Sequence, residues 1–262
     1  MIHEGIYGVP DFEVCKLREK SSRYVVLIPV INEGDRLHKE LRRAKHDNVH
    51  KKADIVICDG GSTDGSVETD KMDKLGVSVI LIKKGKGRQG AQLRMGFWWS
   101  FQQNYDGIIT IDGNNKDSIE DVDKFIKKMD EGYGFVQGSR FVRGGMAIRT
   151  PVMRLIAVRL IHAPVISMTA GYRFTDTTNA FRGYSAEYLK DKRVEPLRDI
   201  FDSYELLAYL STRASQLGYR VCEVPVTRRY PKGKVPTKIS VWKGQLELLK
   251  ILFCNLMGKY EP

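Results

Sequence analysis

The sequence predicts an α/β fold in which a mostly parallel sheet is flanked by helices. Two observations support this prediction. Short apolar runs alternate with longer segments of helical periodicity, and two of the apolar runs end in a turn that begins with an aspartate. Strands that alternate with helices of about ten or more residues pair in parallel and carry helices on both faces of the sheet. With 262 residues and 42% hydrophobic content, the chain can form one domain with a substantial core.

The first half of the chain repeats a strand–helix unit and predicts a Rossmann-like, nucleotide-binding layout. Its helices carry charged residues on their outer faces, and Asp64 is suited to cap the second of them. The predicted strands are Tyr24 to Pro29, Ala53 to Cys58, Val77 to Ile82, Gly107 to Ile111 and Gly134 to Gln137. The predicted helices are Asn32 to Lys45, Asp64 to Leu75, Gln89 to Gln103 and Ile119 to Met129.

Two apolar stretches in the second half predict helices that lie in a membrane interface. Thr150 to Met168 is interrupted by charged residues and a proline, and it is shorter than the roughly 20 apolar residues that span a bilayer. Val241 to Met257 has the same amphipathic character. We therefore expect residues 1–22 to be an extension, 23–240 the main domain and 241–262 an amphipathic helix.

Composition limits the location and the partners. A net charge of +11 favours a polyanionic partner, which can be nucleic acid, anionic lipid or a phosphorylated substrate. The four cysteines form no Cys-x-x-Cys pair, so the sequence predicts neither a zinc site nor a disulfide framework. The first 20 residues lack the apolar core of a signal peptide. We expect a cytoplasmic protein.

Two predicted strands end in polar turns that begin with Asp59 and Asp112. In an open α/β sheet, ligands bind outside the carboxyl ends of the strands. The two aspartates are therefore expected to face one shared site for a polar, metal-associated ligand.

A glycine-rich loop follows the third predicted strand and matches Gly-x-Gly-x-x-Gly at Gly85, Gly87 and Gly90. This dinucleotide fingerprint normally occupies the first strand–helix turn and is followed by an acidic residue about 20 positions later. A solvated, charged turn explains the loop equally well. A nucleotide-binding oxidoreductase is therefore the third-ranked hypothesis for this chain.

Seven segments together resemble the family-2 inverting glycosyltransferases of the GT-A fold. Within that family the chain is most similar to the dolichol- or polyprenyl-phosphate mannose and glucose synthases, and the resemblance covers roughly Arg23 to Ser240. The segments are Ile28 to Glu33, Asp59 to Gly65, Lys84 to Gly90, Asp112 to Asn114, Gly138 to Phe141, Asp176 to Arg182 and Glu223 to Val226.

The resemblance implies a donor site for a nucleotide-diphosphate sugar. It also implies that Mg²⁺ or Mn²⁺ is held by Asp112 and Asn114, since these hard cations prefer oxygen ligands. Asn114 stands where many relatives have a second acid of the metal motif, which predicts weaker metal binding, and Gly60 stands where many have an acid after Asp59, which leaves the base of the nucleotide open. The donor-binding residues that the resemblance implies are Pro29, Asn32, Glu33, Asp59, Lys86, Gln89, Asp112, Gly113 and Asn114.

The resemblance further implies a lipid-phosphate acceptor, for which arginine is suited by its bidentate fork. Arg140 and Arg154 are expected to bind this phosphate. Four cations, Arg228, Arg229, Lys234 and Lys238, lie in a segment expected to form a mobile loop over the site, and we assign Arg229 and Lys238 to the acceptor phosphate. Such cations can also be ordinary surface residues.

These inferences predict a metal-dependent inverting glycosyltransferase on the cytoplasmic face of a membrane, with a polyprenyl-phosphate acceptor and no nucleic-acid partner. Asp112, Asp176 and Arg140 are the predicted catalytic residues. Asp176 would be the base where one is needed, and anchoring of its loop is the equal alternative. Two other functions stay open: extension of a cell-envelope glycan through a hydroxyl acceptor, and a non-catalytic basic binding module. A membrane-anchor subunit and a homo-oligomer are also open.

Overall fold

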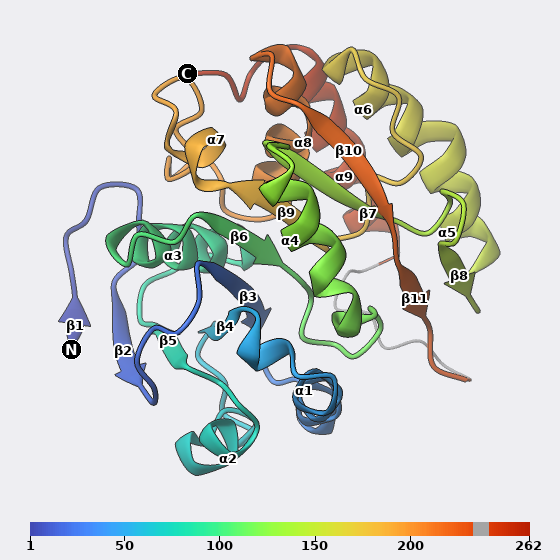
Figure 1. Cartoon of the computed structure of the whole chain (residues 1–262). Helices are drawn as coiled ribbons and strands as arrows, with labels where there is room; N and C mark the ends of the chain where they lie inside the picture. The colour runs from blue at the N-terminus through green and yellow to red at the C-terminus, as the bar shows by residue number, and fades with distance from the viewer. Residues whose placement is uncertain (233–240) are drawn as a thin grey trace.

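The computed structural model describes residues 1–232 and 241–262, and in these residues nine strands form one mixed sheet (Figure 1). Their order across the sheet is β1-β2-β5-β4-β3-β6-β9-β7-β10. The strands are β1 (Ile2–His3), β2 (Phe12–Lys16), β3 (Tyr24–Val30), β4 (Asp54–Asp59), β5 (Val79–Lys83), β6 (Gly107–Thr110), β7 (Phe135–Ser139), β9 (Arg182–Ser185) and β10 (Val221–Pro225). Strands β8 (Met146–Ile148) and β11 (Thr227–Arg229) pair in parallel as a second small sheet.

The predicted mostly parallel sheet is confirmed. Strands β5, β4, β3 and β6 pair in parallel, and so do β7 and β10. Strand β9 runs antiparallel between β6 and β7. The segment 1–22, which we expected as an extension, contributes β2, and β2 pairs antiparallel with β5.

Helices cover both faces of the sheet. Figure 1 shows α3 on one side of the central strands and α1 and α2 on the other. The helices are α1 (Asp35–His46), α2 (Thr69–Lys74), α3 (Gln89–Gln102), α4 (Val122–Asp130), α5 (Val152–Ala157), α6 (Ala163–Ala170), α7 (Ala186–Lys190), α8 (Glu205–Gln216) and α9 (Val241–Leu256), with 3₁₀ turns at Val49–Lys51 and Ile119–Asp121.

Two helices begin later than the sequence predicts because the residues before them form turns. Before α1, Asn32 and Gly34 have φ values of 48° and 53°, a left-handed conformation that a right-handed helix does not contain. Before α2, Asp64 accepts a hydrogen bond from the Ser66 N–H at 3.0 Å, and Gly65 has a φ of 71°. Asp64 thus caps a turn that precedes the helix.

The central strand β3 alternates its side chains between two cores. Val25 and Leu27 belong to the core that α3 covers, whereas Val26 and Ile28 belong to the core that α1 and α4 cover. Truncating such a buried leucine or isoleucine to alanine typically costs about 2–5 kcal/mol. Gly96 of α3 is required for close packing, since a Cβ there would lie 2.8 Å from a Leu27 methyl carbon. These two cores fix the strand ends that build the site.

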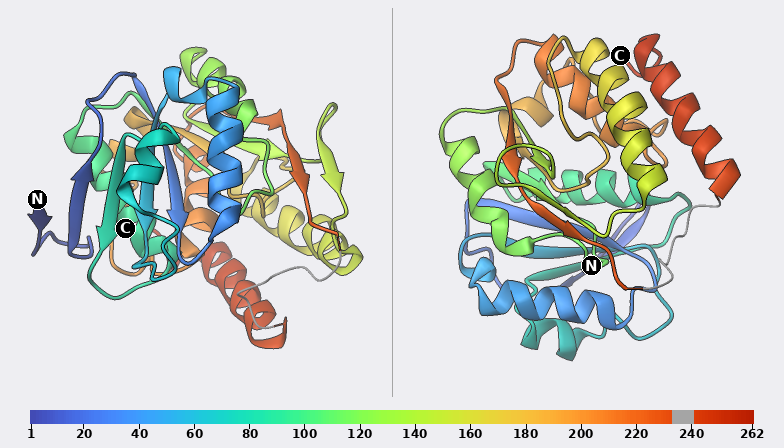
Figure 2. Two further views of the ribbon diagram at one scale, coloured as in Figure 1. Left: turned by 90° about the horizontal axis from the view of Figure 1, so that it is seen from below. Right: turned by 90° about the vertical axis from the view of Figure 1, so that its right-hand side faces the viewer.

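The predicted interfacial segment forms one continuous helical stretch, Val152–Ala170, made of α5, a π-helical turn (Val158–His162) and α6. It is 19 residues long with a mean hydropathy of 1.4, and 22% of it is buried. By length and composition alone it could cross a membrane, although the sequence predicts a segment too short and too charged for that. Figure 2 shows it beside α9, which packs against α6.

Candidate active site

The carboxyl ends of three parallel strands form the floor of the site. Strand β3 lies between β4 and β6, with Val30 paired to Asp59 and Leu27 paired to Thr110. Asp59 therefore ends one neighbour of β3, and Asp112 follows the other. The strand order reverses direction at this point, where ligands of open α/β sheets bind. The two aspartate-ended strands thus end at one edge of the sheet, on either side of β3, and the prediction that both carboxylates face one shared ligand stays a prediction.

Asp59 is 2% exposed and is held by its own turn. Its carboxylate accepts hydrogen bonds from the Ser62 N–H at 3.0 Å and from the Ser62 hydroxyl at 2.6 Å. In this arrangement the carboxylate shapes the turn after β4. Its predicted contact with the nucleoside stays a prediction.

The turn after β3 is joined to the turn after β4. The Asn32 side-chain oxygen accepts from the Thr63 N–H at 2.8 Å, and the Asn32 N–H donates to the Ser62 hydroxyl at 3.0 Å. Glu33, whose side chain is 12% exposed, forms an ion pair with Arg36 at 2.8 Å. The predicted donor residues Pro29, Asn32 and Glu33 therefore lie together with Asp59 at one edge of the sheet.

Asp112 is the carboxylate at the centre of the site. Its Oδ1 accepts from Gln89 Nε2 at 3.1 Å, and its Oδ2 accepts from Asn114 Nδ2 at 3.3 Å and from Arg228 Nη2 at 3.2 Å. Gly113 permits the close approach of this turn to β3, since a Cβ there would lie 2.6 Å from Val30 Cγ1. The structure thus brings the predicted residues Gln89, Asp112, Gly113 and Asn114 together.

The donor set around Asp112 does not fit a resident divalent cation. Mg²⁺ and Mn²⁺ require several hard oxygen ligands. Both oxygens of Asp112 already accept hydrogen bonds, and one of these comes from a guanidinium group. Asn114 turns its amide nitrogen toward Asp112, and its oxygen accepts from the Lys116 N–H at 3.3 Å. Within residues 1–232 and 241–262, no group of three or more histidine, cysteine or acidic side chains is placed to hold a metal ion.

Arg228 connects the site to a second, deeper carboxylate. Its Nη1 donates to Asp117, which is fully buried, and the Arg228 side chain is 8% exposed. Burial alone would lower the pKa of Arg228, but the carboxylates of Asp117 and Asp112 raise it well above its ordinary value. The sequence placed Arg228 among loop cations, whereas the structure places it in β11.

Lys116 and Tyr230 complete this cationic cluster, and neither was predicted. The Lys116 ammonium lies 5.3 Å from the centre of the Tyr230 ring, and the Arg228 guanidinium lies 5.8 Å from it. Arg154, at the start of the long helical stretch, donates to the Tyr230 hydroxyl at 2.9 Å. Burial alone would raise the pKa of Tyr230, but Arg228 and Arg154 together lower it below its ordinary value.

The sequence did contain a signal for two of these residues. Val224, Val226 and Tyr230 alternate along the chain as in a strand, with Arg228 in the same register, and the structure buries Arg228 and Tyr230 while Arg229 is exposed. Lys116 carried no comparable signal, because its position depends on the turn that follows Asp112. Burial lowers the pKa of Lys116, and the nearby Arg228 lowers it further.

Arg140 and Asp176, two predicted catalytic residues, bind each other in the interior. Their side chains are 1% and 0% exposed. Arg140 donates to Asp176 through Nε at 2.6 Å and through Nη2 at 2.8 Å, and its backbone N–H donates to the same carboxylate at 3.2 Å. The predicted roles of phosphate ligand and base both require this pair to open, so they stay predictions.

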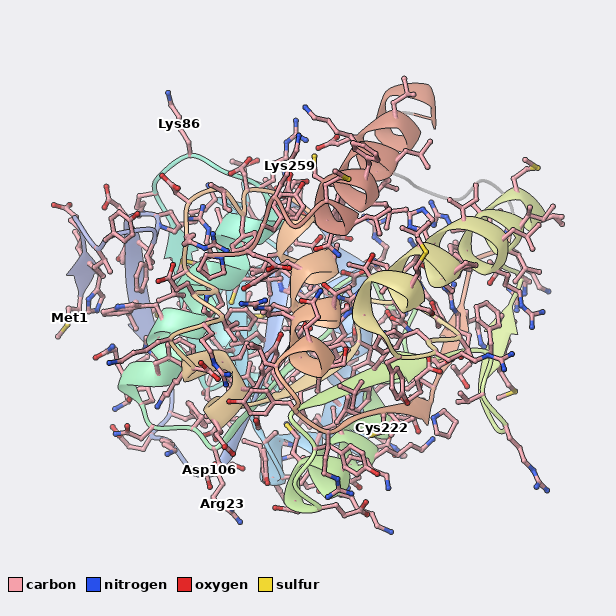
Figure 3. All side chains as sticks on the ribbon, turned by 90° about the horizontal axis from the view of Figure 1, so that it is seen from above. Met1, Arg23, Lys86, Asp106, Cys222 and Lys259 are labelled. Atoms are coloured by element: carbon pink, nitrogen blue, oxygen red, sulfur yellow. The ribbon has the colours of Figure 1, made fainter. Side chains whose placement is uncertain are left out.

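The remaining predicted residues lie farther from Asp112 or outside the described residues. Arg229 is exposed on β11. Lys86 is exposed in the glycine-rich loop, and Figure 3 shows it pointing away from the body of the protein. Lys238, like Lys234, lies outside the described residues. Of the predicted cations, Arg154 is linked to the site through Tyr230 and Arg228, whereas the Lys86 side chain is exposed to solvent.

Comparison with known proteins agrees with this geometry. The sequence model described as Glycosyl transferase family 2 matches residues 25–192, which is more than half of the chain. The chain belongs to glycosyl transferase family 2. The predicted family and the predicted glycosyltransferase class are confirmed. The solved structures below share its GT-A fold, so that prediction is confirmed as well.

Among curated proteins, the family-2 chain is similar to polyprenol monophosphomannose synthase of Mycolicibacterium smegmatis, with 26% identity over 79% of this chain and 77% of that protein. It is also 26% identical to undecaprenyl-phosphate mannosyltransferase of Micrococcus luteus, over 78% of this chain and 83% of that protein. Among solved structures, glucosyl-3-phosphoglycerate synthase from Mycobacterium tuberculosis, in complex with Mn²⁺, UDP and phosphoglyceric acid, superposes with a TM-score of 0.63 at 13% identity, covering 89% of this chain and 78% of that one.

Proposed function

We propose that this family-2 glycosyltransferase transfers a sugar from a nucleotide-diphosphate sugar to a polyprenyl phosphate at the surface of a membrane. One observation carries the proposal: a short path of side chains links the strand ends to an exposed apolar helix. Asp112 contacts Arg228, and the Arg228 guanidinium packs over Tyr230. The Tyr230 hydroxyl in turn accepts a hydrogen bond from Arg154 of α5.

The donor end of this path is the edge formed by β3, β4 and β6. We assign the nucleoside to the joined turns that contain Pro29, Asn32, Glu33 and Asp59. The sugar diphosphate would then reach the turn of Asp112. The position at the topological switch point supports this assignment, because nucleotides bind there in related sheet architectures.

The acceptor end is the apolar surface formed by Val152–Ala170 and α9, which are packed together. Large apolar side chains are exposed on both elements and on the residue that follows α9: Val152, Met153, Ile156, Leu160, Ile161, Met168, Leu246, Leu249, Phe253, Leu256 and Met257. Contiguous exposed apolar surface marks protein or membrane contacts. A lipid surface is the occupant that also delivers a phosphate headgroup to Arg154. The names of the two curated relatives agree with this acceptor class.

The chemistry needs no strong base when the acceptor is a lipid phosphate. The second pKa of a phosphate monoester is about 6, so its oxygen is ionised near neutrality. This oxygen attacks the anomeric carbon, a new carbon–oxygen bond forms, and the bond from that carbon to the donor diphosphate breaks with inversion. Arg154 would orient the acceptor phosphate, and the cationic residues beside Asp112 would stabilise the leaving diphosphate.

The predicted Mg²⁺ or Mn²⁺ at Asp112 and Asn114 stays a prediction. Support comes from the solved neighbour, which was crystallised with Mn²⁺ and UDP. The residues of this chain do not fit the ion in their present arrangement, and the reaction above is written without it.

A transfer assay tests the proposal. The protein is mixed with nucleotide sugars labelled in the sugar and with undecaprenyl or dolichyl phosphate in vesicles, and the label is followed into organic solvent. We expect lipid-linked label, and Asp112→Ala should lower its formation about 100-fold or more, because Arg228 and Gln89 lose the carboxylate that positions them and misplaced binding groups cost about that much in rate. Asp123→Ala, at an exposed position of α4, is the matched control.

Two outcomes would contradict the proposal. Label that enters only water-soluble glycans would show a hydroxyl acceptor instead. Full turnover of Asp112→Ala would remove this residue from the reaction, and circular dichroism of each variant keeps loss of fold distinct from loss of chemistry.

A further inference from the structure

We infer that Arg228 and Lys116 supply the positive charge for the donor diphosphate from the protein itself, so that this chain binds its donor without a divalent cation. The inference rests on the proposed nucleotide-diphosphate donor and concerns the same site. It follows from the misfit between the ligands around Asp112 and a metal ion, and from the two cations found there instead.

Arg228 is fixed in place by its surroundings. Strand β11 is tied to the turn after Asp112 by backbone hydrogen bonds from Arg229 N–H to Lys116 C=O at 2.7 Å and from Ser118 N–H to Thr227 C=O at 2.9 Å. The Asp117 carboxylate is 0% exposed and binds the Arg228 guanidinium from the interior of the protein. Arg228 therefore keeps its position beside Asp112 with no ligand present, as a preorganised cation must.

Lys116 lies two positions after Asn114. It brings an ammonium group to the segment that contains the predicted metal ligands Asp112 and Asn114. Its ammonium lies over the ring of Tyr230, at 5.3 Å from the ring centre. A ring face stabilises a cation through its quadrupole and leaves N–H donors available for an anion. Lys116 is thus suited to receive a phosphate oxygen at this edge of the site.

The formal charges of Asp112, Asp117, Arg228 and Lys116 sum to zero without a metal. Asp112 and Asp117 contribute two negative charges, and Arg228 and Lys116 contribute two positive ones. The Glu40 carboxyl lies beside this turn and accepts from the Asn115 N–H at 2.7 Å, and burial raises its pKa well above the ordinary value. A divalent cation beside two carboxylates would give the same total formal charge of zero. Here the two positive charges lie on N–H donors, which bind phosphate oxygens directly.

Adding Mg²⁺ or Mn²⁺ to this site would be unfavourable for the same reason. The ion would have to displace the Arg228 contact from Asp112 and would then lie next to two fixed cations. Like charges a few ångströms apart repel each other at the effective dielectric constant near a protein surface. A diphosphate has oxygens on two phosphorus atoms and can accept hydrogen bonds from both cations at once.

Binding of nucleoside diphosphates with and without metal tests this inference. Calorimetry with UDP, GDP, CDP and ADP is run in EDTA and again in Mn²⁺. We expect one of them to bind in EDTA with an affinity within about threefold of its affinity in Mn²⁺, a difference of less than 1 kcal/mol. Lys116→Ala should weaken that binding about tenfold, and Lys39→Ala, at an exposed position of α1, should leave it unchanged.

Further variants distinguish a loss of nucleotide binding from a loss of the fold. Arg228→Ala leaves Asp117 buried without its partner and can unfold the protein, so Arg228→Lys, which retains the charge, is measured with it. The double variant Asn114→Asp/Lys116→Gln restores oxygen donors. We expect this variant to lose binding in EDTA and to regain it in Mn²⁺, and equal binding under both conditions would count against the role of Lys116.

The outcomes separate this inference from the proposed function. Binding by the unmodified chain that requires Mn²⁺ would overturn the metal-free site and leave the transfer reaction intact. Failure of every nucleoside diphosphate to bind under either condition would overturn the nucleotide donor, and with it both proposals.

Discussion

The two sides of the site are held together by different kinds of contact. On the donor side, hydrogen bonds hold partly exposed turns, both within one turn, as between Asp59 and Ser62 three residues away, and between turns, as between Asn32 and Thr63 31 residues away. On the acceptor side, and at its border with the proposed site of the donor diphosphate, buried ion pairs join distant segments: Arg140 and Asp176 are 36 residues apart, and Asp117 and Arg228 are 111 residues apart. The donor side is therefore a set of partly exposed turns joined by hydrogen bonds, whereas the acceptor side depends on ion pairs buried in the interior.

The two sides also differ in how strongly their polar groups depend on their partners. The acceptor-side pairs are almost wholly desolvated, so each charge depends on its partner. A buried ion pair adds little net stability compared with apolar residues, but removing one partner leaves an uncompensated charge. The donor-side turns keep part of their surface in water, where a lost hydrogen bond is largely replaced. Substitutions should therefore be far more costly on the acceptor side.

The largest effect is expected at the buried pair of Arg140 and Asp176. Arg140→Ala leaves the Asp176 carboxylate unpaired at 0% exposure and should lower the free energy of unfolding by about 3–5 kcal/mol. Denaturation with urea measures this change.

A double variant decides whether the pair has a second role. Arg140→Met/Asp176→Leu replaces both charges with apolar groups and should recover most of the lost stability. If this stable variant also transfers sugar at the normal rate, the predicted catalytic roles of Arg140 and Asp176 are excluded. If it is stable and inactive, the pair acts in the reaction as well as in the fold.

The same contrast explains what the sequence could predict. The strands, their parallel pairing and the convergence of Asp59 and Asp112 follow from short-range periodicity and from the rule that strand ends share one edge. The pairing of Arg140 with Asp176 does not follow from any local pattern, because it depends on where β7 lies relative to a loop 36 residues later. For the same reason we predicted Arg228 to lie in a loop, although its alternation with Tyr230 indicated a strand.

An intermediate effect is expected at the apolar surface beside the acceptor side. Leu160, 72% exposed on the long helical stretch, should bury its side chain in lipid, and full burial of a leucine contributes about 1.5–3 kcal/mol. Leu160→Ser should therefore weaken retention on anionic vesicles about tenfold or more. Vesicle sedimentation gives this measurement.

The control for Leu160 lies on the far side of the molecule. Ile2 of β1 is 61% exposed, and Figure 1 places β1 opposite α5. Ile2→Ser removes a comparable apolar side chain and should leave retention unchanged. Equal losses from the two substitutions would mean that retention reflects general hydrophobicity, and no loss from either would remove the membrane role of the helix.

The smallest effect is expected in the donor-side turns. Ser62→Ala removes the hydroxyl that donates to Asp59 and that accepts from the Asn32 N–H. The Ser62 N–H still donates to Asp59, so the loss should be about 1–2 kcal/mol in the free energy of unfolding. Thr63→Ala is the matched control, because Thr63 contributes only its backbone N–H to Asn32 and should change stability by less than about 0.5 kcal/mol. A loss from Ser62→Ala as large as that from Arg140→Ala would mean that the donor-side turns are as dependent on fixed partners as the acceptor-side ion pairs.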